Sequence, residues 1–312
     1  MKNKNTTTLQ MGILLFLLIQ GVFAVVGYKF FLSLSIKNTI LSIFLGSLFG
    51  VLFLHIYFYF LKKIDWKKIT KIKVVKIVYL VFLSLTTSYF LYLFSSYIHY
   101  IYLNKNNLLF IMITLFLLFL YTYHLKPFIL SRTLEIILYI FLFFVFIKII
   151  GLVPYVDVLS LIPLTDGNIA NILLSSILFG IITSVLVFLL LIFFNKEIDS
   201  KKIKYYLTSS YVSSCFLLLV SYVLIIGILG YKLGIFYPYP EVMILKNIAF
   251  FDFIERVDYI LVFEYLLVIY SLISILLLNI KKTIHSFKNV FFDKHISLYL
   301  VFLFIISFIF NW

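Results

Sequence analysis

The chain of 312 residues is too apolar to fold as a water-soluble globule, because 64% of its residues are hydrophobic and only 12% are charged. A soluble domain has about a quarter charged residues. The net charge of +14 comes from lysines clustered between apolar stretches, which is typical of membrane-protein loops and not of a surface that binds nucleic acid. The composition therefore predicts an all-α protein that crosses a lipid bilayer several times.

The predicted spans are apolar stretches of about 20 residues, the length of helix that crosses the hydrocarbon core of a bilayer. We expect nine of them, at roughly 10–32, 38–61, 77–103, 107–125, 129–153, 169–194, 206–236, 258–280 and 296–311. The first follows two lysines and has no small-residue cleavage site at its end. We therefore expect it to be retained as a helix and not removed as a signal peptide.

The basic residues are distributed unevenly between the two sides of this arrangement. On the side of the N-terminus lie 19 of the 26 lysines and arginines, and seven lie on the other side. Lys148, at the outer end of the fifth span, is counted among these seven. Because cytoplasmic loops of membrane proteins are enriched in lysine and arginine, we expect the N-terminus to be cytoplasmic.

Two longer segments interrupt the spans on the outer side, at 154–168 and 236–258. The second opens with Tyr237-Pro238-Tyr239-Pro240. Its remainder has apolar residues three and four positions apart beside charged ones, the pattern of an amphipathic helix at an interface. These apolar residues are Val242, Leu245, Ile248, Ala249, Phe253 and Ile254. We expect this helix to lie on the outside of the bundle.

Ionisable side chains within the predicted spans are candidates for function, because burying them in lipid is costly. Glu264 lies in the eighth span among apolar residues. It could carry a proton, or it could be hydrogen-bonded to a Tyr or Ser of a neighbouring helix. Arg132 and Glu135 are three residues apart near the inner end of the fifth span. A charge pair at this spacing would fix the orientation of its helix.

The sequence offers no pattern for a metal site or a catalytic centre. Cys215 is the single cysteine, and His55 and His99 are isolated, so no group of His, Cys, Asp and Glu has the spacing of a metal site. A catalytic triad, a phosphate-binding loop and a carboxylate dyad are also not recognisable. We therefore expect neither a cofactor nor an enzymatic activity.

Glycines and hydroxyl-bearing residues gather in the first, third and sixth spans. Gly21 lies in the middle of the first span and Gly180 in the middle of the sixth. Transporters built from inverted repeats open the corresponding helices of their two halves near the midplane, and the freed backbone contacts the substrate. Ser84, Thr87 and Ser176 could line the same polar cavity. The alternative interpretation is that these small residues only allow close packing of helices.

Three segments of the sequence follow one another in a recognisable order. They are Arg132-Thr-Leu-Glu135-Ile, the linker from Ile162-Pro163 to Asn168 with Phe179-Gly180 after it, and Tyr237-Pro238 followed by Asp252-Phe-Ile-Glu255-Arg256-Val-Asp258. This series resembles spore-germination proteins of the GerAB type, permease-like members of the amino acid–polyamine–organocation superfamily. The chain differs from that family's pattern at Ile181, where the family has Glu, and at Tyr265, where it has tryptophan.

The resemblance implies one transmembrane permease-like domain over 1–312, with the LeuT-like architecture of two inverted repeats. The first repeat would cover about 10–153 and the second, shortened repeat about 169–311. We expect nine helices, one fewer than the ten of that architecture.

The function that the resemblance implies is that of the B subunit of a nutrient germinant receptor in the inner membrane of an endospore. Such a subunit binds a small nutrient such as an amino acid within the bundle and triggers germination together with A and C subunits. The candidate ligand-binding residues are Gly21, Ser84, Thr87, Ser176, Gly180 and Glu264. Arg256 and Asp258 would form an outer gate pair. Two other functions stay open: a proton-coupled transporter of amino acids or other small solutes that acts through Glu264, and a degenerate scaffold subunit that binds no ligand.

Overall fold

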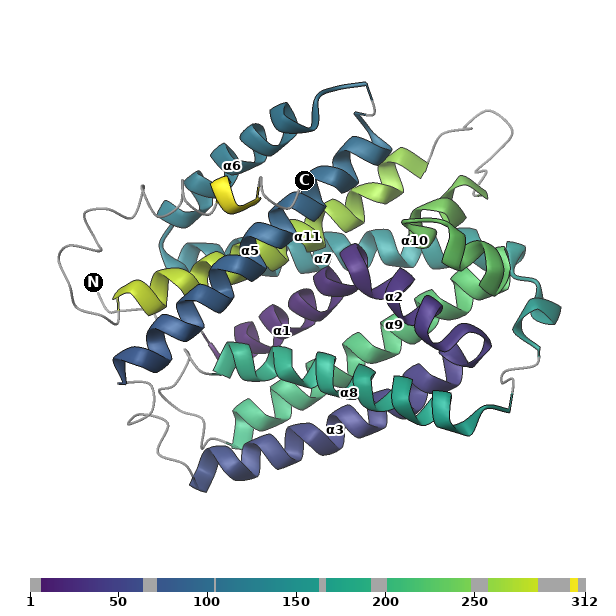
Figure 1. Cartoon of the computed structure of the whole chain (residues 1–312), viewed down its shortest axis with the longest axis horizontal. Coiled ribbons are helices and arrows are strands. Elements are labelled where there is room, and N and C mark those ends of the chain that lie inside the picture. Colours follow the sequence, from purple (N-terminus) through teal and green to yellow (C-terminus); the bar gives the residue numbers. More distant parts are fainter. Residues whose placement is uncertain are drawn as a thin grey trace.

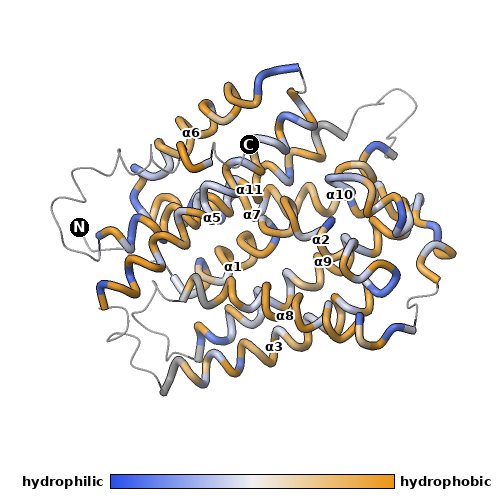
Figure 2. The backbone as a smooth tube through the Cα atoms, in the orientation of Figure 1, coloured by the Kyte–Doolittle hydropathy of each residue, from blue (hydrophilic) through white to orange (hydrophobic). Residues whose placement is uncertain are grey.

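A computed structural model of the chain describes residues 7–63, 72–103, 105–162, 167–191, 201–247, 258–285 and 304–307. Within these ranges the backbone is almost entirely helical and contains no β-strand. Apolar residues run along the helices, and polar residues gather near the helix ends (Figure 2). The prediction of an all-α protein is confirmed for the described part of the chain.

The helices occupy the ranges that the hydropathy pattern predicts. In chain order they are α1 (Thr8–Val22), η1 (Phe23–Gly27), α2 (Tyr28–Ser35), η2 (Ile36–Asn38), α3 (Thr39–Lys63), α5 (Lys73–Ile101), α6 (Leu108–His124), α7 (Pro127–Leu152), η3 (Val153–Tyr155), η4 (Val158–Leu161), α8 (Ile169–Leu191), α9 (Lys201–Phe236), α10 (Pro240–Met243), η5 (Ile244–Asn247) and α11 (Asp258–His285). The first to the eighth predicted spans each contain a helix. The ninth, at 296–311, lies outside the described residues except for 304–307.

Six helical stretches of the described chain are long and apolar enough to cross a membrane. They are Thr8–Phe60, Lys73–Ile101, Pro127–Tyr155, Ile169–Val187, Lys202–Phe236 and Leu261–His285. Thr8–Phe60 contains two legs, because the chain turns back between α2 and α3 (Figure 1). Ile36 takes a φ of 48° in this turn, a backbone conformation that side chains with a β-branch rarely adopt.

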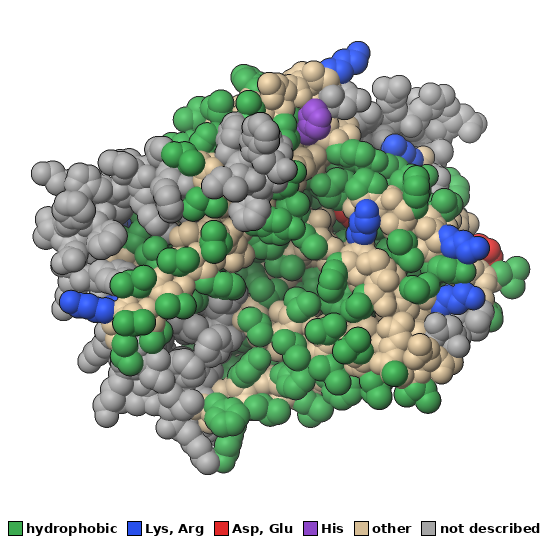
Figure 3. All heavy atoms as spheres, viewed as in Figure 1, with side chains coloured by type: hydrophobic (Ala, Val, Ile, Leu, Met, Phe, Trp, Pro, Cys, Tyr) green, Lys and Arg blue, Asp and Glu red, His purple; other side chains and the backbone are tan. Residues whose placement is uncertain are grey.

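The outer surface of the bundle is apolar. Tyr139, Phe143 and Phe146 on α7 are each more than 60% exposed, and hydrophobic side chains are spread over the described part of the face shown in Figure 3, with few charged ones among them. A surface of this kind would be unfavourable in water and is the expected surface of a helix bundle in lipid. The structure thus supports a protein that is embedded in a membrane.

The first helix is the core of the bundle. α1 lies between α8 and α9 on one side and α5, α7 and α11 on the other (Figure 1), and it packs against α7, α8, α9 and α11. The residues from Leu14 to Ile19 are all less than 10% exposed. A helix that is apolar on every side is buried on every side, so the site described below is built around it.

The closest helix pair is α3 with α8, and glycines bring the two backbones together. A Cβ on Gly180 would lie 3.0 Å from the carbonyl oxygen of Gly46 and 3.0 Å from the amide nitrogen of Gly50. A Cβ on Gly46 would lie 2.8 Å from the carbonyl oxygen of Ser176. Small residues at such positions let two membrane helices approach closely.

This packing corrects the prediction that the sixth span opens at Gly180. α8 continues as a regular α-helix from Ile169 to Leu191. Gly180 instead allows this helix to pack closely against α3. The first span is also helical throughout, although it does leave regular α-helical geometry. It forms one π-helical turn, η1, at Phe23–Gly27, directly after Gly21 and Val22.

The segment after Pro240 differs from the prediction at Glu241. Val242 and Leu245 are buried, as the apolar face of a helix lying on the bundle should be, but Glu241 is only 1% exposed as well. The segment forms the short helix α10 and the 3-10 turn η5 and packs against α9. Residues 248–257 of this segment lie outside the described part of the chain.

Candidate functional site

The π-helical turn η1 is held by a tyrosine of the neighbouring helix. The Tyr222 hydroxyl, on α9, donates a hydrogen bond to the carbonyl oxygen of Gly27 at 2.8 Å. The rings of Tyr222 and Tyr28 lie 5.2 Å apart between centroids, and both side chains are buried. π-Helical turns interrupt the regular hydrogen-bond ladder of a helix and occur often at functional sites.

A small cavity adjoins this turn. Its lining comes from the first helix, from α7, from α9 and from α11. The lining residues are Gln20, Ala24, Tyr28, Phe141, Val145, Lys148, Leu217, Ser221, Tyr265 and Val268. Five of these side chains carry polar groups, which is an uncommon concentration in a bundle whose helices are otherwise apolar.

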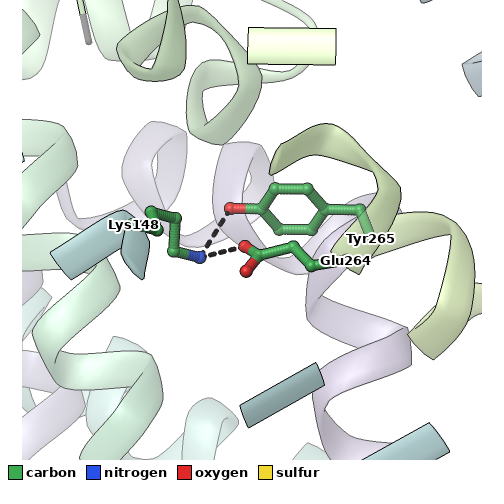
Figure 4. Close-up of polar contacts among 3 residues, drawn as sticks. All are labelled: Lys148, Glu264 and Tyr265. Atoms are coloured by element: carbon green, nitrogen blue, oxygen red, sulfur yellow. Dashed lines mark hydrogen bonds and ion pairs between the residues drawn. The ribbon is translucent and has the colours of Figure 1, made fainter. Parts of the chain in front are cut away.

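An ion pair forms the charged wall of the cavity (Figure 4). The Lys148 ammonium group, on α7, is bonded to the Glu264 carboxylate, on α11, and it also donates to the Tyr265 hydroxyl at 3.1 Å. Lys148 is 4% exposed and Glu264 is fully buried. Two opposite charges that share a hydrogen-bonded contact can be buried together, whereas either one alone would be strongly unfavourable.

Gln20 fixes the opposite side of the cavity. Its side-chain amide donates to the carbonyl oxygen and to the hydroxyl of Ser214, on α9, at 3.0 Å each. Both residues are buried. The first helix is therefore tied to α9 by side chains on each side of the cavity, through Gln20 before η1 and through Tyr222 behind it.

A second buried carboxylate lies next to the ion pair. Glu241, the second residue of α10, is 1% exposed. The pKa of Glu241 is raised to about 8, chiefly by burial and in smaller part by the charge of Glu264, whereas a hydrogen bond from its own backbone and the charge of Lys148 lower it. The rings of Tyr97 and Tyr239 pack beside it, with centroids 4.8 Å apart. Carboxylates with displaced pKa values are frequent at functional sites.

The structure does not bring the predicted ligand-binding residues together in this cavity. Gly21 follows Gln20 but faces α11, where a Cβ would lie 2.7 Å from the carbonyl oxygen of Val268. Gly180 faces α3. Glu264 does not line the cavity either, but it is bonded to Lys148, which does. The interpretation of Gly21 and Gly180 as packing residues is the one that these contacts favour.

The three predicted hydroxyl residues bond within their own helices. Ser84, Thr87 and Ser176 donate to backbone carbonyls four residues earlier, at 2.6 Å in each case. Thr87 lines a separate small cavity, whose other walls are almost entirely apolar. This second cavity lies between α5, α6 and α11. A hydroxyl that already serves its own helix contributes little to the recognition of a ligand.

The predicted charge pair on α7 has different partners from those expected. Arg132 is exposed and lies over the ring of Phe128, 4.5 Å from its centroid. Glu135 accepts a hydrogen bond from the side chain of Gln10 at 3.4 Å. Glu135 thus links α7 to α1. Of the proposed outer gate pair, Arg256 and the side chain of Asp258 lie outside the described residues.

The hydropathy pattern predicts neither the burial of Lys148 nor that of Glu241. It places Lys148 among the outer-side charges and Glu241 in a helix that lies on the bundle, whereas both side chains are buried. The signal for Lys148 was present, because it stands in an uninterrupted apolar run of the fifth span and Glu264 offers the opposite charge in the eighth. No comparable signal marks Glu241, which follows two prolines in a segment rich in turns.

Metal ligands are not clustered in the described residues, where no three His, Cys, Asp or Glu side chains come together. Cys215 is buried in α9 as a free thiol. Comparison with known proteins adds nothing to this picture, since no protein-family model, no curated protein and no solved structure matches the chain.

Proposed function

We propose that this chain binds a small solute inside the membrane, in the cavity between the first helix, α7, α9 and α11. The observation that carries the proposal is the coincidence of this cavity with η1, the one π-helical turn in the described chain. Gln20, Ala24 and Tyr28 line the cavity from the interrupted first helix. Binding or release of a solute can therefore act directly on the backbone geometry of that helix.

The chemistry of the lining supports a small polar solute. Lys148 offers a cation, and Gln20, Tyr28, Ser221 and Tyr265 offer amide and hydroxyl groups. A few well-placed polar groups among apolar walls are the usual composition of a small-molecule site. In this conformation the cavity has room for about one water molecule. A solute of the size of a small amino acid therefore binds only if the lining side chains and η1 move apart.

The receptor role follows from the resemblance to GerAB-type spore-germination proteins. In this proposal the chain is the B subunit of a nutrient germinant receptor in the inner membrane of an endospore, and it works with A and C subunits. Solute binding triggers germination only if one conformation binds the solute more tightly than the other, because equal affinity shifts no equilibrium. The LeuT-like inverted repeat is part of the same proposal. The π-helical turn in the first helix supports this architecture, whereas the regular helix α8 offers no such support.

Equilibrium binding to the purified chain tests the cavity. A panel of amino acids and other small nutrients is titrated, and the solute that binds is then measured on two variants of α9. Ser221→Leu fills the cavity and should weaken binding at least tenfold, by about 1.4 kcal/mol. Ser213→Leu, on the exposed face of the same helix, is the control and should bind like the wild type. Equal affinity of both variants would remove the cavity as the binding site.

The ion pair favours one second candidate, a proton-coupled transporter of amino acids or other small solutes. Lys148 faces the cavity and is bonded to Glu264, so occupancy by a charged solute and protonation of the carboxylate would be coupled. Reconstituted vesicles decide between the two functions. Solute uptake that requires a proton gradient and is lost in Glu264→Gln supports transport, and binding without uptake supports the receptor. A wild-type chain that binds no nutrient would leave a degenerate scaffold subunit.

A further inference from the structure

Three buried oxygen atoms near the ion pair have no hydrogen-bond partner among the described residues. They are the Tyr97 hydroxyl on α5, Oε2 of Glu241 on α10 and Oε2 of Glu264 on α11. All three residues are at most 1% exposed. Buried polar atoms in folded proteins are nearly always paired, and each exception calls for an explanation such as a bound ion.

The three residues belong to one cluster. The ring of Tyr97 lies 4.8 Å from that of Tyr239, two residues before Glu241, and 6.4 Å from that of Tyr265, next to Glu264. Tyr97 is also under the electrostatic influence of both carboxylates. The three unpaired oxygens therefore come from three different elements and belong to groups that lie within electrostatic range of one another.

The charges of this cluster do not balance. Glu241 and Glu264 carry two negative charges when ionised, and Lys148 supplies one positive charge. The other titratable groups around Glu241 are the hydroxyls of Tyr28, Tyr97, Tyr222, Tyr239 and Tyr265. Tyrosine hydroxyls are neutral near pH 7.

The lysines that the structure describes do not restore the balance. Lys29, Lys232 and Lys246 lie on the elements that pack against α10, and all three are exposed. Among the described residues, one uncompensated negative charge thus remains in the buried cluster, which is strongly unfavourable. The folded protein gains stability from whatever supplies one positive charge there.

We propose that Oε2 of Glu241, Oε2 of Glu264 and the Tyr97 hydroxyl form a site for one monovalent cation, either a proton held by one of the carboxylates or an alkali-metal ion. Carboxylate and hydroxyl oxygens are ligands for hard cations. The single missing charge selects a monovalent cation over a divalent one. The site does not require a bound nutrient, so it stands or falls independently of the function proposed above.

The alkali-metal arm of the test measures the thermal unfolding midpoint of the purified full chain in detergent, one pH unit above the Glu241 pKa of about 8. Sodium, potassium and choline chloride are compared at equal ionic strength. An alkali-metal ion that occupies the site raises the midpoint above that in choline, and Glu241→Gln abolishes the difference. Glu135→Gln, which alters a carboxylate paired with Gln10, is the matched control and keeps the difference.

The proton arm uses infrared spectroscopy and the pH dependence of the midpoint. A proton at the site gives the carbonyl band of a buried protonated carboxyl group near neutral pH, and Glu241→Gln removes it. The pKa of Glu241 is raised from 4.5 to about 8 by folding. Its protonated form therefore stabilises the fold fully below pH 4.5, and this contribution is lost as the pH rises towards 8. The decrease of the unfolding midpoint with rising pH should be absent in Glu241→Gln.

Tyr97→Phe gives a second test that keeps both carboxylates. In the alkali-metal case it should raise the sodium or potassium concentration for half the effect by roughly tenfold. In the proton case it should shift the pH at which half of the stabilisation by the protonated carboxyl group is lost. The proposal is overturned if the wild type shows neither an alkali-metal effect nor a protonated carboxyl band that depends on Glu241. Stabilisation by calcium but not by sodium or potassium would also overturn it.

Discussion

Lys148 and Glu264 depend on each other more than on any other side chain around them. Replacing Lys148 with Met leaves the Glu264 carboxylate buried without a counter-charge. We expect a loss of about 3–5 kcal/mol in the free energy of unfolding. Denaturant unfolding of the purified variant in detergent, at neutral pH, measures the effect.

The double variant Lys148→Met/Glu264→Gln is the control for this prediction. It removes both charges and should recover most of the lost stability, since an uncharged pair of similar volume can replace a buried ion pair at little cost. If Lys148→Met alone were as stable as the wild type, the ion pair would not be formed in the membrane-embedded protein.

The sequence identified one partner of this pair and missed the other. Glu264 is conspicuous, because it is the only acidic residue in its apolar stretch and has no boundary nearby. Lys148 stands only five positions before Val153 and Pro154, where the fifth span ends, and lysine side chains near helix ends commonly reach the interface. Its buried position depends on the approach of α11 to α7, which is a tertiary contact that hydropathy does not encode.

At the scale of the elements, the π-helical turn η1 is stabilised from outside. Tyr222→Phe removes the hydrogen bond to the carbonyl oxygen of Gly27 and should cost about 0.5–1.5 kcal/mol in the free energy of unfolding. Because Ala24 in the same turn lines the cavity, the affinity for a bound solute should change as well. Tyr205→Phe, on the exposed face of α9, is the control and should change neither quantity. A loss of stability with unchanged affinity would separate η1 from the binding site.

The contact of α3 with α8 makes a sharper prediction about glycine. Gly180→Ala places a methyl group 3.0 Å from two backbone atoms of α3, which cannot move without shifting the whole helix. We expect a net loss of stability, because overpacking costs about 1–3 kcal/mol and the gain in helix propensity offsets up to about 1 kcal/mol. Thermal unfolding of the variant in detergent measures it.

Gly234→Ala is the matched control within a helix. Its methyl group would meet no described atom closer than 3.4 Å, which is ordinary contact. The helix propensity of alanine should therefore leave α9 as stable as before or more stable, by up to about 1 kcal/mol. Equal behaviour of the two variants would mean that α8 does not rest on α3 at Gly180.

The elements show clearly which features a sequence can predict. Helix positions follow from the length and apolarity of each stretch, and α5 at Lys73–Ile101 agrees with the predicted span at 77–103 within a few residues. The role of a glycine within a helix does not follow from the same pattern. The sequence around Gly180 is compatible both with an opened helix and with a closely packed one. Only the position of Gly46 and Gly50 on α3 distinguishes the two.

For the whole molecule, the apolar surface and the uneven distribution of lysines make a joint prediction. The surface places the bundle in a membrane, and the positive-inside rule orients it. With Lys148 buried in the ion pair, only six basic residues remain on the predicted outer side, so the bias is stronger than the sequence count alone suggests. The orientation itself stays a prediction.

Labelling of single cysteines tests the orientation at the two ends of α6. Lys105 and Lys126 are both exposed and flank this helix, whose 17 residues span about 25 Å. With Cys215 replaced by alanine, Lys105→Cys should react with a membrane-impermeant maleimide on intact cells. Lys126→Cys should react only after the membrane is permeabilised.

α6 is the informative helix for this experiment, because it is shorter than the six long apolar stretches. Labelling of both cysteines on intact cells would mean that α6 does not cross the membrane, and every later helix would then change its direction relative to the first. Labelling of Lys126→Cys alone would invert the whole topology and place the lysine-rich segments outside, against the positive-inside rule. The expected pattern, Lys105→Cys only, fixes the cavity in the outer half of the bundle, because Lys148 lies near the end of α7 that is remote from Lys126.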